Sequence, residues 1–162
     1  MTRVDQINRL TGMSFFIAAA VCFAALAILR PGEIGSIRIG PIRTGKDQCA
    51  SCGMTIEDAR FAGRRTVQHG GKPATLLYDD LGCMLDADRE NEAGKAIACS
   101  VQDFDGAGWI KASDAWYVMD PKNRTPMGSG ILAFAKRPAG KVMTFEGVRE
   151  ARHTYMRAKF GG

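Results

Sequence analysis

Sulfur ligands dominate the residues of this chain that could do chemistry. Cys49, Cys52 and Met54 fall within the short sequence CASCGM, and Met127 lies in the sequence TPMG. Thiolate and thioether sulfur are soft ligands that prefer Cu(I) to the harder divalent ions. The 162 residues include only two histidines, so the sulfur residues point to metal binding before they point to catalysis.

Each of these four residues also has an ordinary structural role that stays open. Met54 could fill an irregular gap in a core, as methionine commonly does. Cys49 could form a disulfide or support a neighbouring thiol. Met127 lies between a proline and a glycine, where core packing is less natural, so the interpretation as a ligand is stronger there. Cys52 is the other strong candidate.

The other sulfur and imidazole side chains of the C-terminal part have weaker claims. Cys83 falls in the first turn of an expected helix, where its pKa could be lowered, or it could be buried and inert. Met84 follows it and is interpreted as a core residue, as is Cys99 in an expected apolar strand. His69 in a turn and His153 on a terminal helix are expected at the surface.

Two other function classes compete with a copper-binding protein. A thiol-disulfide oxidoreductase could use Cys49 and Cys52, but such a motif usually follows a strand and opens a helix, whereas Gly/Pro-rich sequence precedes this one. A structural zinc module would need four ligands at typical spacing, and Cys83 and Cys99 form no second close pair.

We expect no enzyme, since no catalytic arrangement stands out. The net charge of +5, without basic residues interleaved with aromatic ones, does not indicate a nucleic-acid partner.

The globular part shows strand patterns around one clear helix. Arg64 to His69 and Ala74 to Tyr78 are expected to form a hairpin across a Gly-containing turn. Asp79 or Asp80 can cap a helix that runs to about Glu92. Ala96 to Phe104 is the next expected strand, which completes a β-β-α-β order.

The second half repeats this order in part. Strands are expected at Ala115 to Met119, at Gly130 to Ala135 and at Lys141 to Phe145, and a final helix at Gly147 to Lys159. The segment between the last two strands, Lys136 to Gly140, is too short for a helix. The pattern therefore predicts an α+β fold whose second unit lacks its middle helix.

The N-terminal segment is the most apolar part of the chain. From Met13 to Leu29 it carries no charge, and extension to Leu10 reaches the roughly 20 residues that a membrane-spanning helix needs. We expect residues 1–30 to form a membrane anchor, residues 31–47 a tether and residues 48–162 the copper-binding domain. More basic residues follow the span than precede it, so simple charge counting favours a cytoplasmic C-terminus. Long domains translocate largely regardless of charge, so the count does not decide the orientation.

Four blocks of the sequence, in this order, resemble the NosL family. They are CASCGMTI at 49–56, YDDLGCM at 78–84, WIKASDAWYV at 109–118 and TPMGSGILAF at 125–134. The resemblance covers roughly Gln48 to Val148. NosL proteins are extracytoplasmic copper proteins, accessory to the maturation of nitrous oxide reductase in denitrification.

The resemblance implies a fold and a ligand set. The fold would consist of two β-β-α-β units, related to a domain of the organomercurial lyase MerB, preceded here by one transmembrane helix. The metal would be Cu(I), with Cys52 as the cysteine of the C-G-M motif and Met127 as the methionine of T-P-M-G. Cys49 and Met54 are the further candidate ligands.

The resemblance also implies a location and a partner. The domain would lie on the extracytoplasmic, periplasmic side, held by the single span, whereas many family members are lipoproteins. It would pass copper to a copper-accepting enzyme or to the membrane assembly complex of that enzyme. The expected function is that of a membrane-anchored copper chaperone for nitrous oxide reductase or a similar copper enzyme.

Overall fold

The computed structural model describes residues 40–90, 94–106 and 108–160. The predicted anchor and the first nine residues of the predicted tether, 31–39, lie outside these ranges. Within the described ranges, no helix combines the length and the apolar character that crossing a bilayer requires. The predicted span over Leu10 to Leu29 lies outside these ranges.

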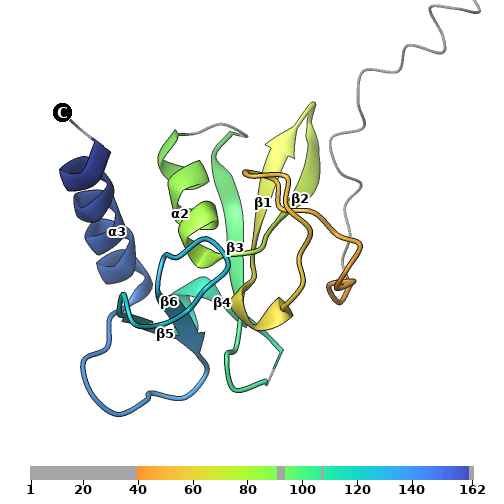
Figure 1. Cartoon of the computed structure of the whole chain (residues 1–162). Coiled ribbons are helices and arrows are strands. Elements are labelled where there is room, and N and C mark those ends of the chain that lie inside the picture. The colour runs from red at the N-terminus through yellow and green to blue at the C-terminus, as the bar shows by residue number, and fades with distance from the viewer. Residues whose placement is uncertain (1–39, 91–93, 107, 161–162) are drawn as a thin grey trace, which may run out of the picture. The chain divides into compact units, whose positions relative to one another are not determined.

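An antiparallel four-stranded sheet forms the first half of the described chain (Figure 1). Strands β1 (Gly63–His69) and β2 (Lys72–Tyr78) form the predicted hairpin. Gly70 and Gly71 between them both have positive φ, of 56° and 77°, which a tight two-residue hairpin turn requires.

Two further strands extend this sheet on the other side of β1. Strand β3 (Ala96–Gln102) pairs with β1, and the short strand β4 (Trp109–Lys111) pairs with β3, so the order is β2-β1-β3-β4. Strand β4 is absent from the sequence-based expectation. It has only three residues, too few to show an alternating pattern.

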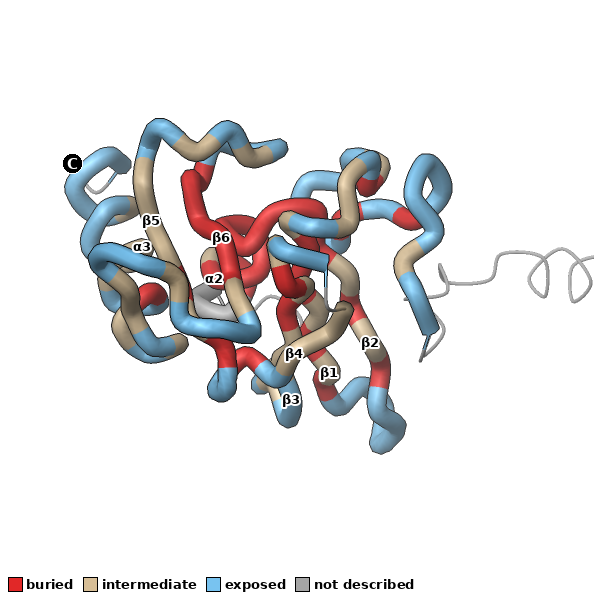
Figure 2. The backbone as a smooth tube through the Cα atoms, turned by 90° about the horizontal axis from the view of Figure 1, so that it is seen from below, coloured by how far each residue is buried: buried red, intermediate tan, exposed pale blue. Residues whose placement is uncertain are grey.

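Helix α2 (Leu81–Glu90) follows β2 and contacts both β1 and β2. Along β2 the buried residues Ala74, Leu76 and Tyr78 alternate with more exposed ones, and the colours along β2 in Figure 2 show this alternation. Met84 on α2 is only 1% exposed and packs closely on Gly63, where an added Cβ would lie 2.6 Å from the Met84 sulfur. Met84 is therefore a core residue, as expected.

The second half contains a two-stranded sheet and the terminal helix. Strands β5 (Trp116–Met119) and β6 (Ile131–Phe134) are antiparallel, and α3 (Phe145–Phe160) contacts α2 and β5. The predicted strand at 141–145 is reduced to one isolated bridge between Met143 and Tyr117. All residues between β6 and α3 are described, and they contain no helix.

Short 3-10 helices, η1 (Ala59–Phe61) and η2 (Ala112–Asp114), precede β1 and β5. The described end of the predicted tether also joins the domain. Gly45 N–H donates to Ile56 O at 3.0 Å, and Ile56 N–H donates to Asp47 O at 2.8 Å. These bonds fasten residues 45–47 to the segment that carries the cysteines.

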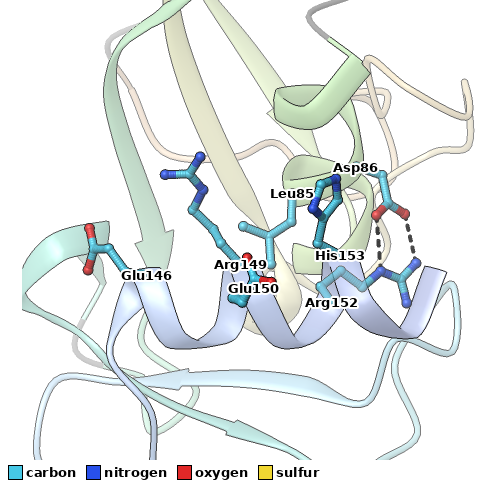
Figure 3. Close-up of a pocket in the computed structure, with 7 residues that line it drawn as sticks. All are labelled: Leu85, Asp86, Glu146, Arg149, Glu150, Arg152 and His153. Carbon is cyan, nitrogen blue, oxygen red and sulfur yellow. Dashed lines mark hydrogen bonds and ion pairs between the residues drawn. The ribbon is translucent and has the colours of Figure 1, made fainter. Parts of the chain in front are cut away.

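A polar pocket is lined by residues of α2 and α3 (Figure 3). Arg152 on α3 makes two hydrogen bonds to the Asp86 carboxylate, with Nε at 3.1 Å and Nη2 at 2.7 Å. His153 and Leu85 also line this pocket, which contains no cysteine. The ion pair links the two helices. We assign no catalytic or binding role to this pocket.

Candidate metal centre

A tight loop presents the first two cysteines. Cys49 N–H donates to Met54 O at 2.8 Å, and Gly53 N–H donates to Cys49 O at 2.9 Å. Gly53 has φ of 74°, a left-handed conformation that glycine adopts without strain. The loop is held on the first sheet because Ala50 N–H donates to Leu77 O at 2.7 Å. Cys49 is buried and Cys52 is exposed.

The end of β2 and the start of α2 bring two more side chains to this loop. Asp79 follows the last residue of β2, and Cys83 lies in the first turn of α2. One ligand atom from each of Cys49, Cys52, Asp79 and Cys83 lies within 4.8 Å of the other three. Three thiols and one carboxylate therefore converge from two parts of the chain, and we call these four residues the thiol cluster.

The three thiols differ in protonation. The Cys83 thiol donates a hydrogen bond to Cys49, which lowers the pKa of Cys49 to about 6 despite its burial. The same bond, together with burial, raises the pKa of Cys83. The pKa of Cys52 is raised by partial desolvation, even though much of its side chain is exposed. At neutral pH the cluster thus holds Cys49 as a thiolate beside two thiols.

Asp79 has one carboxylate oxygen without a hydrogen-bond partner. The residue is 2% exposed, and its Oδ1 accepts a long hydrogen bond from Cys52 Sγ at 3.7 Å. Its buried Oδ2 accepts no hydrogen bond from any described residue. Burial of an unpaired carboxylate oxygen is costly. A cation bound between the sulfurs and Asp79 would compensate this charge, so the donor set fits a metal ion.

The two candidate methionine ligands are exposed. Met54 is 52% exposed and lies two residues after Cys52, and Met127 is 45% exposed. Burial in the core is therefore excluded as the role of either side chain. The backbone of Met127 is held close to the start of α2, because its N–H donates to Asp80 Oδ2 at 2.9 Å.

The remaining candidates lie elsewhere. Cys99 is half-buried against the core, in agreement with its expected core role, and it is not part of the thiol cluster. His69 is exposed and His153 is half-buried in the pocket between α2 and α3. Neither histidine joins a group of potential ligands among the described residues.

The sequence indicates Asp79 only as a helix cap, and it supports Cys83 less strongly than the four candidate ligands. The structure brings both into contact with the C-x-x-C loop. A signal for both existed: the strand-ending sequence YDDLGC places a carboxylate and a cysteine about one helical turn apart. Only the docking of the cysteine loop on β2 shows that they share a site.

A mixed α/β fold with three thiols and a buried carboxylate in one cluster defines a candidate metal-binding protein. A sequence profile of the NosL family matches residues 42–153. The chain therefore belongs to the NosL family, as its motifs predicted.

Comparison with solved structures agrees with this assignment. The chain is similar to the crystal structure of the copper chaperone NosL from Shewanella denitrificans, with a TM-score of 0.57 and 18% identity. The match covers 72% of this chain and 98% of that chain. At this identity the similarity concerns the fold. No protein with a curated description is significantly similar in sequence.

Proposed function

We propose that this protein is a membrane-anchored, extracytoplasmic copper chaperone that carries Cu(I) to nitrous oxide reductase or to a similar copper enzyme. The observation that carries the proposal is the convergence of Cys49, Cys52, Asp79 and Cys83 within 4.8 Å. Copper as the cargo is supported by membership of the NosL family and by the similarity in fold to a copper chaperone. In keeping with this role, the protein binds and transfers an ion and is not an enzyme.

The chemistry of the site supports Cu(I). Cys49 is already a thiolate near pH 7, because its pKa is about 6, and thiolate favours a soft monovalent ion. We assign Cys52 and Met127 as the principal ligands, with Cys49 and Met54 as further donors. A neutral thioether can hold Cu(I) without making its release depend on proton uptake at that ligand.

The exposure of three of the four proposed ligands supports transfer. Cys52, Met54 and Met127 are all exposed, whereas Cys49 and Cys83 are buried. An ion held by exposed ligands can be reached by a thiol or thioether of an acceptor, which replaces one ligand at a time. The proposed acceptor is the copper enzyme itself or its assembly complex in the membrane.

Zinc is the second candidate, and one observation favours it. Four donors that include a carboxylate form a set that Zn(II) accepts in tetrahedral sites. Structural zinc sites are closed, however, and Cys52 is exposed. An oxidoreductase is less well supported, because Cys49 and Cys52 precede a 3-10 helix and a strand instead of opening an α-helix.

Anaerobic titration of the reduced full-length chain in detergent separates these functions. Competition with chromophoric chelators measures its affinity for Cu(I) and for Zn(II). We expect one tightly bound Cu(I) per chain and much weaker Zn(II) binding. Cys99→Ser is the matched control, since Cys99 lies outside the thiol cluster. Zinc binding as tight as that of Cu(I) would refute the chaperone and favour a structural zinc site.

A further inference from the structure

Asp80 is a fully buried carboxylate whose hydrogen bonds join two distant parts of the chain. Its exposed fraction is 0%, and it directly precedes α2. Oδ1 accepts from Gly82 N–H at 2.6 Å, which is an N-cap contact. Oδ2 accepts from the Thr125 hydroxyl at 2.7 Å and from Met127 N–H at 2.9 Å. One carboxylate thus caps the helix and holds the T-P-M-G turn.

The turn is also closed internally around Thr125. Gly128 N–H donates to Thr125 O at 3.0 Å, and Gly130 N–H donates to Thr125 Oγ1 at 3.2 Å. Thr125 Oγ1 is therefore a donor to Asp80 and an acceptor for Gly130. These bonds form one connected network, so the backbone position of Met127 depends on the carboxylate of Asp80.

The turn packs directly against the start of α2. An added Cβ at Gly82 would lie 2.6 Å from the Cβ of Ser129 and 3.1 Å from Asp80 Oδ1. The loop after β5 thus approaches the helix as closely as a residue without a side chain permits. This contact is one residue from Cys83, a member of the thiol cluster.

Asp79 and Asp80 are adjacent in the sequence but make different contacts. Asp79 contacts Cys52 within the thiol cluster, and Asp80 holds the backbone of Met127. A helix N-cap alone does not require a buried carboxylate, because serine, threonine or asparagine caps a helix as well. Burial of a carboxylate is tolerated where several donors stabilise its charge. The two extra donors here both belong to the Met127 turn.

We propose that Asp80 is a positioning residue for the metal centre: it holds the Met127 turn at the thiol cluster so that the thioether can bind Cu(I). This inference rests on the proposed function, in which Met127 is a ligand. Asp80 itself would not be a ligand, because its two oxygens already accept three hydrogen bonds. Its substitution should therefore weaken the binding of an ion that uses the thioether and spare an ion that uses only the thiols and Asp79.

The test compares two ions in the full-length chain, reduced and in detergent under anaerobic conditions. The affinity for Cu(I) measures the contribution of the thioether. The affinity for Cd(II), a thiolate-binding ion with a sulfur charge-transfer band, measures the contribution of the thiols. The variants are Asp80→Asn, Met127→Leu and the combination of both. Asn has the same shape but only one acceptor oxygen, so it cannot accept all three bonds. Asp86→Asn on the same helix is the matched control, because it breaks the ion pair with Arg152 instead.

We expect Met127→Leu to weaken Cu(I) binding by about tenfold or more, and Asp80→Asn by at least about threefold. The double variant should be no weaker than Met127→Leu alone within about twofold, because both changes remove the same interaction. Cd(II) affinity should change by less than about twofold in every variant, and Asp86→Asn should leave both affinities unchanged. This pattern would support the positioning role.

Two other patterns would overturn the inference, and they differ. If Met127→Leu weakens Cu(I) binding but folded Asp80→Asn does not, Asp80 is only a helix cap. If Met127→Leu has no effect on Cu(I) binding, Met127 is not a ligand, and the proposed ligand set itself is wrong. Should Asp80→Asn not fold, Thr125→Val decides, because it removes one donor to Asp80 and leaves the cap intact. Full Cu(I) affinity in that variant would contradict the proposal.

Discussion

At the scale of single residues, the Cys83 side chain stabilises the thiolate of Cys49. Cys83 holds the proton and donates it in a hydrogen bond, and Cys49 carries the charge. A metal that binds Cys49 therefore displaces no proton from it at neutral pH. The metal-free site therefore already carries a thiolate that can bind a cation.

The pKa of Cys49 can be measured directly. In the reduced, metal-free chain, ultraviolet thiolate absorbance should rise with a midpoint of about pH 6. Cys83→Ala removes the hydrogen bond, so the midpoint should move toward the ordinary thiol value of about 8.5. Cys99→Ala should leave it in place. A midpoint near pH 6 that persists in Cys83→Ala would show that another group stabilises the thiolate.

The same pKa predicts how stability depends on pH. The pKa of Cys49 is lower in the folded protein than in the unfolded chain, so the unfolded chain binds more protons between about pH 6 and about pH 8.5. The free energy of unfolding should rise with pH across this window, and this contribution should disappear below about pH 6. Denaturant titrations at several pH values test the sign, and Cys49→Ala should flatten the slope.

Loss of a proposed ligand should be visible in the copper affinity. Cys52→Ser and Met127→Leu should each weaken Cu(I) binding by tenfold or more, which corresponds to about 1.4 kcal/mol. Met119→Leu and Met143→Leu are the controls, because both methionines pack against the core. Leucine nearly conserves the volume of methionine. Chelator competition that finds equal affinity for Met127→Leu and for the controls would exclude Met127 as a ligand.

At the scale of elements, the loop between β5 and β6 determines where Met127 lies. The loop returns to β6 through Gly130, which has φ of 68° and whose carbonyl accepts from Asp120 N–H at 3.0 Å. A Cβ at Gly130 would lie 2.2 Å from Asp120 O, so no other residue fits without a backbone shift. The bond between Asp120 and Gly130 thus joins the two ends of the loop, and Asp80 holds its middle at Thr125 and Met127.

Gly130→Ala should therefore destabilise the domain more than a similar change elsewhere. We expect a loss of about 3 kcal/mol or more in the free energy of unfolding. Gly45→Ala is the matched control: its φ of 71° is nearly the same, but an added Cβ would meet no atom within 4 Å, so the cost should be about 1 kcal/mol. Denaturant unfolding measures both. Equal losses would show that the contact with Asp120 carries no cost.

At the scale of the whole molecule, we propose that the predicted anchor and the candidate metal centre act together. An extracytoplasmic domain on a single span over Leu10 to Leu29 would keep the carrier close to a membrane-bound assembly complex. A reporter enzyme that is active only outside the cytoplasm, fused after Gly162, should be active. A cytoplasmic reporter at the same position should be inactive, and the opposite result would place the domain in the cytoplasm.

Local patterns in the sequence were sufficient to predict the hairpin and α2. Alternation in β2 and the Gly70-Gly71 turn are properties of neighbouring residues, so the chain shows them before it folds. The four sequence blocks at 49–56, 78–84, 109–118 and 125–134 were also sufficient to indicate the family, which the profile match confirms. Local patterns could not predict the short strand β4 or the single bridge at Met143, because both form by pairing with residues that are distant in the sequence.

The composition of the candidate site was decided only by the tertiary structure. Asp79 lies 27 residues after Cys52, and Asp80 lies 47 residues before Met127, so no local period relates them. Their contacts exist because the cysteine loop docks on β2 and the loop before β6 docks on the start of α2. The sequence by itself determined which side chains carry atoms that can ligate a metal ion. Packing between distant segments decided which of them meet, since side-chain proximity depends on how the elements are placed and not on residue type.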